Sequence, residues 1–150
     1  MFLNIMGGFI IPWLLGLIIL KKKTGVIVTI VPIASLIAMV FNELGFYFKF
    51  WSFGPVTPSD ESLSALPLDL GIYPVMACLM IFWIRTKRIR HVVSIGVITI
   101  ATTLLEYAAL LMGRVHYGNG WNAFYTFISY LAAYVIVYFY DRLLRKIMLA

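Results

Sequence analysis

Five long apolar stretches, separated by short polar connections, constrain the fold of this chain more than any other feature. Each has about the 20 residues with which an α-helix crosses a hydrocarbon core of about 30 Å. Because 63% of the 150 residues are hydrophobic and only 12% are charged, the sequence excludes an ordinary soluble domain. It predicts an all-α polytopic membrane protein, a single transmembrane domain over residues 1–150, whose five helices run from Phe2 to Leu20, Gly25 to Phe46, Pro67 to Ile84, Val92 to Met112 and Asn122 to Tyr140.

Basic residues predict the orientation of these helices. All 12 Lys and Arg residues except Lys49 and Arg114 fall in three clusters, which follow the first, third and fifth apolar stretches. Cytoplasmic connections carry the excess of Lys and Arg in membrane proteins, so the N-terminus is expected outside and the C-terminus in the cytoplasm. The basic residues that give the net charge of +6 are grouped between apolar stretches rather than spread over one face. This pattern predicts that the chain interacts with the lipid bilayer and not with nucleic acid.

Three carboxylates, Glu43, Asp69 and Glu106, lie inside or at the ends of these apolar stretches. An ionisable group in hydrocarbon costs a few kcal/mol or more, so such a residue is a functional-site hypothesis by default. At a helical rise of about 1.5 Å per residue, the three stand about 24 to 30 Å from the cytoplasmic charges, in the outer third of the membrane. On the last helix, the same distance back from Arg142, where the last basic cluster begins, reaches Thr126. We therefore expect a polar layer at one height.

Neighbouring residues extend that layer. Thr102 and Thr103 precede Glu106 by about one helical turn, Asn42 adjoins Glu43, and Tyr73 follows Asp69 by one turn. Pro74 cannot donate to the carbonyl of Leu70, which leaves that acceptor for a side chain, water or ligand. The candidate ligand- or proton-binding residues are therefore Glu43, Asp69, Glu106, Asn42, Tyr73, Thr102 and Thr103, with Lys49, Arg114 and His116 at the outer rim.

Several uses of the carboxylates remain open at this stage. They could hold and release a proton, or their oxygens and the freed carbonyl could hold a hard cation. In the competing interpretation, Glu43 and Asp69 are helix-end residues near water, and only Glu106 is buried, satisfied by Arg114 or by a hydroxyl. No cysteine or histidine metal motif, phosphate loop or serine elbow is present in the sequence. We therefore predict no metal and no cofactor, and we assign no catalytic residue.

The two outer connections are the longest irregular segments. Residues Tyr47 to Leu66 and Gly113 to Trp121 are rich in turn-forming and aromatic residues, and they are either candidate lids or ordinary interfacial connectors. Each follows a helix that ends near a glutamate. A parallel repeat would set Glu43 and Glu106 in equivalent places, although coincidence explains the pattern as well.

Short motifs from Asn42 onward carry a resemblance to a known family. They are Leu66-Pro67-Leu68-Asp69-Leu70-Gly71-Ile72-Tyr73-Pro74, Leu105-Glu106-Tyr107, then Gly113, Tyr117 and Trp121, and a tyrosine-rich last helix that ends in basic residues. In these the chain resembles a family of small polytopic membrane proteins of spore-forming Firmicutes, which has no established activity. The resemblance implies a bacterial plasma or spore membrane and adds weight to Asp69 and Glu106 without giving them roles. A more distant likeness is to short membrane-bound isoprenoid cyclases, which also use intramembrane acids.

Three classes of function follow from these observations. The first is an intramembrane acidic site near the outer leaflet that binds or moves a small molecule, cation or proton. The second is an accessory or structural membrane subunit, in a homo-oligomer or with another membrane protein. The third is an enzyme that acts on a lipid or isoprenoid. Transport predicts a cavity that reaches both sides, an accessory role predicts direct salt bridges without a cavity, and a lipid enzyme predicts a lateral apolar opening beside a carboxyl.

Overall fold

The computed structural model describes residues 2–21, 23–54, 61–87 and 89–148, and these are almost entirely helical. Within them, four helices are long and apolar enough to cross a membrane: Thr24–Tyr47 (α3), Glu61–Thr86 (α4, Glu61–Asp69, and α5, Ile72–Thr86), His91–Leu111 (α6) and Ala123–Met148 (α7). The first predicted segment is a shorter apolar helix, Phe2–Ile18, built from α1 (Phe2–Ile5), η1 (Met6–Ile10) and α2 (Ile11–Leu20). An all-helical membrane fold is thus supported, while the count of five spans stays a prediction.

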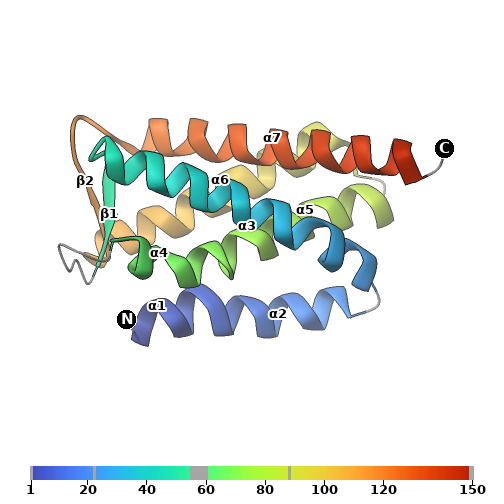
Figure 1. Cartoon of the computed structure of the whole chain (residues 1–150), viewed down its shortest axis with the longest axis horizontal. Coiled ribbons are helices and arrows are strands. Elements are labelled where there is room, and N and C mark those ends of the chain that lie inside the picture. Colours follow the sequence, from blue (N-terminus) through green and yellow to red (C-terminus); the bar gives the residue numbers. More distant parts are fainter. Residues whose placement is uncertain (1, 22, 55–60, 88, 149–150) are drawn as a thin grey trace.

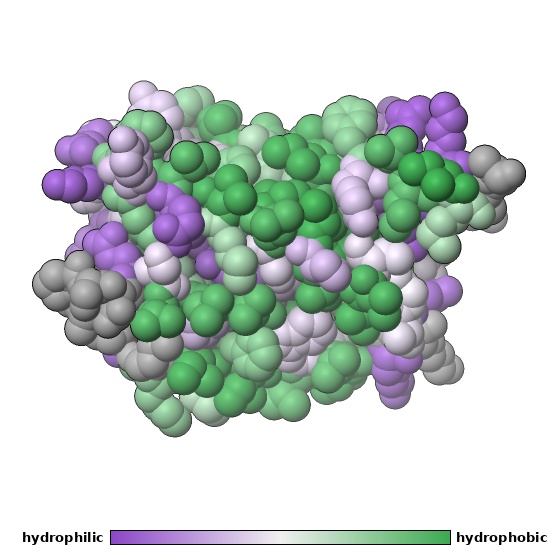
Figure 2. Space-filling model, viewed as in Figure 1, coloured by the Kyte–Doolittle hydropathy of each residue, from purple (hydrophilic) through white to green (hydrophobic). Residues whose placement is uncertain are grey.

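The helices lie side by side along the long axis of the molecule (Figure 1). Helix α5 packs against α2, α3 and α6, while α7 packs against α3 and α6. Fully buried apolar side chains between them include Ile30, Met80, Ile81 and Ile98. The C-terminus lies at one end with the α2–α3 and α5–α6 connections, so the three basic clusters share that end; Lys22 and Arg88 lie outside the described residues. Figure 2 shows a hydrophobic belt between two more hydrophilic ends.

The third span is interrupted at Leu70 and Gly71, between α4 and α5. Pro74 has no N–H to donate to the Leu70 carbonyl, and the indole Nε1 of Trp13 on α2 donates to it instead, at 2.8 Å. The sequence predicted that a side chain, water or ligand would satisfy this carbonyl, and a side chain does so. The bond also ties the first helix to the break in the third span.

Glycines allow the first helix to approach this break closely. A Cβ on Gly71 would lie 2.0 Å from the carbonyl oxygen of Gly8 and 2.6 Å from the Cα of Phe9. The approach coincides with η1, a wider π-helical turn in which the Ile11 N–H donates to the Met6 carbonyl. Backbone packing of this kind, through small residues, is a common way for membrane helices to associate.

The two outer connections pair with each other, which the sequence did not predict. Trp51–Phe53 (β1) and Val115–Tyr117 (β2) form a two-stranded antiparallel sheet, with Trp51 opposite Tyr117. The Gly118 N–H also donates to the Phe50 carbonyl at 2.8 Å. The connections therefore form one joint cap over the end of the bundle opposite the C-terminus (Figure 1). Residues 55–60 of the first candidate lid lie outside the described residues.

The turns that lead into the two strands are equivalent. After α3, the Phe48 N–H donates to the Leu44 carbonyl at 3.0 Å, and after α6 the Met112 N–H donates to the Ala108 carbonyl at 3.1 Å. The next residue has a positive φ in both turns, 55° in Lys49 and 67° in Gly113.

This equivalence changes the predicted repeat by one residue. Because Leu44 corresponds to Ala108, the counterpart of Glu106 is Asn42 and not Glu43. The two halves thus place an amide and a carboxylate at the same level of α3 and α6.

Substitution of Gly71 by alanine tests the close approach. Gly71→Ala forces its Cβ into the Gly8 backbone, so we expect a loss of about 2 kcal/mol of unfolding free energy. The control is Gly96→Ala on α6, where an added Cβ meets nothing within 4 Å. Thermal unfolding in detergent, followed by circular dichroism, measures both. Equal midpoints for the two variants would contradict the proposed contact between the first helix and Gly71.

Candidate functional site

Three hydroxyl groups, one from the β cap and two from α7, lie around the carboxylate of Glu106 on α6. Its Oε1 accepts from the Tyr117 hydroxyl at 2.8 Å and lies 3.3 Å from the Thr126 hydroxyl, and its Oε2 accepts from the Tyr130 hydroxyl. Within the described residues no Lys, Arg or His pairs with it. Of the two predicted ways to satisfy Glu106, hydroxyl groups are the one observed.

Further hydrogen bonds extend this cluster to both sides. The Trp121 indole donates to Thr126 Oγ1 at 2.8 Å, and Thr126 Oγ1 lies 2.9 Å from the Tyr117 oxygen. On the other side, the hydroxyls of Tyr130 and Tyr73 lie 3.2 Å apart. Burial, with the adjacent Glu106 carboxylate, raises the pKa of the Tyr117 phenol above its ordinary value, so it stays a protonated donor.

Asp69 belongs to a second polar cluster, at the end of α4. The side-chain amide of Asn42 donates to Asp69 Oδ1 at 2.6 Å, and the Asn42 oxygen accepts from the Trp51 indole at 3.1 Å. Asp69 is 3% exposed, so it is not the water-facing helix end of the competing interpretation. Trp51 and Tyr117, partners across the sheet, thus bond the equivalent residues Asn42 and Glu106.

Glu43 has a different environment. Its side chain is exposed and accepts from the Ser62 hydroxyl at 2.5 Å. The two threonines before Glu106 bond their own helix, Thr102 to the Ile98 carbonyl and Thr103 to the Thr99 carbonyl, and Thr102 also contacts the Tyr134 hydroxyl at 2.7 Å.

Among the described residues, the three carboxylates therefore do not form one metal-binding group. Each has its own partners, and among the described residues no three His, Cys, Asp or Glu side chains are grouped to hold a metal ion. The Leu70 carbonyl, the fourth oxygen of the cation hypothesis, already accepts from Trp13. The hard-cation arrangement has no geometric support.

Two cavities meet at Glu106. The larger, about 340 Å³, has walls of the first helix, α4, α5, α6, α7 and the β cap. They are formed by Leu3, Asn4, Gly7, Gly8, Phe53, Leu68, Ile72, Tyr73, Thr102, Leu105, Glu106, Ala109, Met112, Arg114, Val115 and Tyr130. The smaller, about 50 Å³, lies among α3, α5 and α7 under Trp51 and Trp121. Because Glu106, Tyr73 and Tyr130 line both, they form the wall between the cavities.

The internal repeat extends to the cavity walls. The larger cavity uses Thr102, Leu105 and Glu106 of α6, and the smaller uses their counterparts on α3, which are Ala38, Phe41 and Asn42. Equivalent faces of the two helices thus line the two cavities, but only one carries a carboxylate.

The predicted rim residues separate into two kinds. Arg114 is half-buried and lines the larger cavity, whereas Lys49 and His116 are exposed. His116 lies in β2 opposite Ser52. Of the rim, only Arg114 can contact a ligand in that cavity.

Sequence reasoning did not select four residues of the cluster, Tyr117, Trp121, Thr126 and Tyr130. The estimate of depth in the membrane did point to Thr126. The spacing of four residues between Thr126, Tyr130 and Tyr134 places them on one face of α7, and this spacing could have indicated the cluster. Trp121 and Tyr117 could not be placed, because nothing in the sequence indicated the sheet.

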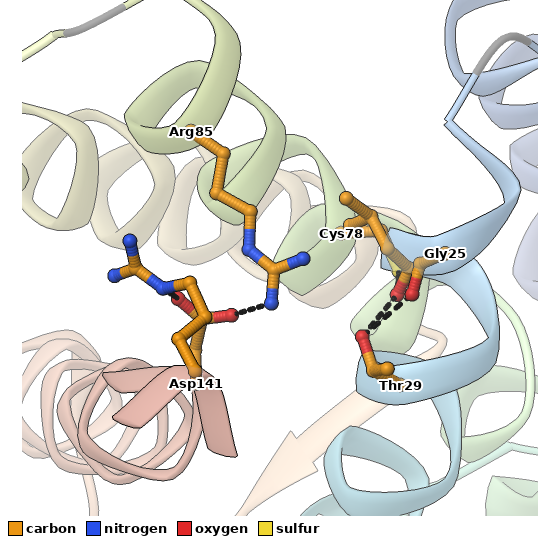
Figure 3. Close-up of polar contacts among 7 residues, drawn as sticks. Gly25, Thr29, Cys78, Arg85 and Asp141 are labelled. Atoms are coloured by element: carbon orange, nitrogen blue, oxygen red, sulfur yellow. Dashed lines mark hydrogen bonds and ion pairs between the residues drawn. The ribbon is translucent and has the colours of Figure 1, made fainter. Parts of the chain in front are cut away.

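A separate charged cluster lies near the C-terminal ends of α5 and α7 (Figure 3), at the end of the bundle opposite the β cap (Figure 1). The fully buried carboxylate of Asp141 on α7 forms ion pairs with Arg85 of α5 and with Arg145, the latter at 3.1 Å. Figure 3 also shows Cys78, whose Sγ is 4.0 Å from the Val26 carbonyl and which is buried among apolar residues. The Arg85–Asp141 pair joins α5 to α7, and the Cys78 contact joins α5 to α3.

Comparison with known proteins finds no match: neither a family model, nor a curated protein, nor a solved structure is similar to this chain. The resemblance to the Firmicutes family therefore stays a prediction, and the site must be interpreted from its geometry.

Removal of one hydroxyl tests the cluster around Glu106. Tyr117→Phe deletes a donor to a half-buried carboxylate, so we expect a loss of about 1 kcal/mol of unfolding free energy. Tyr107→Phe is the control, since Tyr107 follows Glu106 on α6, is 44% exposed and has no hydrogen bond within the described residues. Chemical or thermal unfolding in detergent compares them. An equal effect of both substitutions would argue against the Tyr117–Glu106 bond.

Proposed function

We propose that this chain is an integral membrane protein that binds a small, largely apolar molecule in the larger cavity, with a hydrogen-bond donor of the ligand on Glu106. The observation that carries the proposal is a carboxylate without a basic partner in the described residues, at the wall of an apolar cavity. A carboxylate at such a wall is suited to bind an amine or hydroxyl group, because charge-assisted hydrogen bonds are strong where water is excluded.

The dimensions of the cavity support a ligand site. Its volume of about 340 Å³ falls within the roughly 300–1,000 Å³ of small-molecule sites, which combine apolar walls with a few convergent polar groups. The π-helical turn η1, with Gly7 and Gly8, lines it, and such turns are frequent at functional sites.

The proposal includes the topology. With the basic end of the bundle in the cytoplasm and the first helix as a fifth span, the N-terminus is outside and the cavity opens in the outer leaflet. The membrane is then the plasma membrane, or the spore membrane if the family resemblance holds.

One specific observation favours a second candidate, an enzyme acting on a lipid or isoprenoid. A carboxyl beside an apolar cavity is the arrangement expected for it, and the tyrosine hydroxyls could relay a proton. An accessory subunit predicts no cavity at the acid, so the cavities weigh against that role. A cavity continuous from one side to the other would favour transport.

Photoreactive amines test binding at Glu106. Diazirine-bearing hexadecylamine and its trimethylammonium counterpart carry equal charge, but only the first donates hydrogen bonds. In proteoliposomes we expect the amine to label peptides of the first helix and α6 about tenfold more, since one charge-assisted bond is worth at least that factor. Mass spectrometry quantifies the labelled peptides.

Two variants decide the outcome. Glu106→Gln should abolish the preference for the amine, and Glu43→Gln, on an exposed carboxylate of the same charge, should leave it intact. A preference that survives in Glu106→Gln, or that is absent from the wild type, would reject the proposed function.

A further inference from the structure

We infer that the ligand of the larger cavity is a single-chain amphiphile that enters sideways from the outer leaflet and has an acidic group, bound by Arg114, next to the donor bound by Glu106. A phosphoethanolamine head on one acyl or isoprenoid chain is the chemistry that fits. This inference rests on the proposed function and names the class of ligand.

Arg114 provides the second polar contact. It lines the larger cavity and, within residues 2–21, 23–54, 61–87 and 89–148, its side chain has no carboxylate partner. Its backbone N–H donates to the Ala109 carbonyl at 2.9 Å, so Arg114 folds back to the level of a residue about 5 Å along the helix from Glu106. An acidic group and a donor about four bonds apart, as in phosphoethanolamine, can contact both, and arginine suits phosphate and carboxylate.

The cavity faces the bilayer. Helices α1 and η1 pack on α4 and α2 packs on α5, while α6 packs on α5 and α7, so the cavity lies between the first helix and α6. Three residues that line it from these two sides, Leu3, Leu105 and Met112, are 53%, 48% and 70% exposed. Apolar side chains that line a cavity and also lie on the lipid-facing surface mark a lateral opening.

The size and chemistry of the walls determine the rest of the ligand. A volume of about 340 Å³ is at the lower end for ligand sites and suits one chain rather than two. Below the polar pair the walls are apolar, formed by residues such as Leu68, Ile72 and Leu105. The chain of the amphiphile lies there and the head lies at the rim under the β cap.

Three photoreactive lipids with the same diazirine chain separate the contributions of the head. The first has a phosphoethanolamine head, the second has phosphocholine, which keeps the phosphate but lacks the N–H donors, and the third is a monoacylglycerol, which has hydroxyls but no anion. In proteoliposomes of the full chain we expect the first lipid to label the peptides around Leu3 and Leu105 about tenfold more than either other lipid.

Five variants, all checked for unchanged thermal unfolding, test the site. Arg114→Gln should abolish the preference over the monoacylglycerol, and Arg114→Lys should retain part of it, while Arg142→Gln at the opposite end is the control. Gly7→Leu fills the larger cavity from a position where a Cβ meets nothing within 4 Å, and should reduce all labelling about tenfold. Gly96→Leu, equally unobstructed at its Cβ but on no wall of either cavity, should not.

The results distinguish this inference from the proposed function. Equal labelling by phosphoethanolamine and monoacylglycerol, or a preference that survives Arg114→Gln, would overturn the acidic head. If the preference over phosphocholine were still lost in Glu106→Gln, the proposed function would stand. Labelling that Gly7→Leu leaves unchanged would overturn the cavity as the binding place.

Discussion

The hydrogen bonds that hold the Glu106 carboxylate are the constraint on which the rest of this structure depends. A carboxylate inside an apolar bundle must be compensated, and here the hydroxyls of Tyr117, Thr126 and Tyr130 do so instead of a basic residue. Those hydroxyls come from the cap and from α7, so the acid determines how α6 meets both. Because no cation in the described residues pairs with it, the carboxyl group remains available to a ligand.

The internal repeat explains why one side of the molecule carries this acid. Equivalent turns after α3 and α6 lead to strands that pair with each other, and the cap then directs Trp51 to Asn42 and Tyr117 to Glu106. The Asn42 amide lines only the smaller cavity, whereas the Glu106 carboxylate lies on the wall that both cavities share. Of the two cavities, only the larger is lined by the first helix and by Arg114.

Much of the fold could be predicted from apolar length and charge, because both act through the bilayer as solvent. The helices, the grouping of basic residues at one end and the freed Leu70 carbonyl follow from local rules. The sheet could not be predicted, since strands of three residues inside aromatic connections carry no periodic pattern. Without the sheet, Glu43 was grouped with Glu106, and Tyr117 and Trp121 were not recognised as parts of the site.

Native mass spectrometry of the protein released from lipid nanodiscs tests most directly whether the cavity beside Glu106 holds a membrane molecule. We compare the wild type with Ala109→Phe, which fills the larger cavity, and with Ala108→Phe, whose side chain is exposed on the same helix. We expect one bound single-chain lipid on the wild type and on Ala108→Phe, and none on Ala109→Phe. Equal lipid occupancy in all three proteins would contradict a lipid site in this cavity.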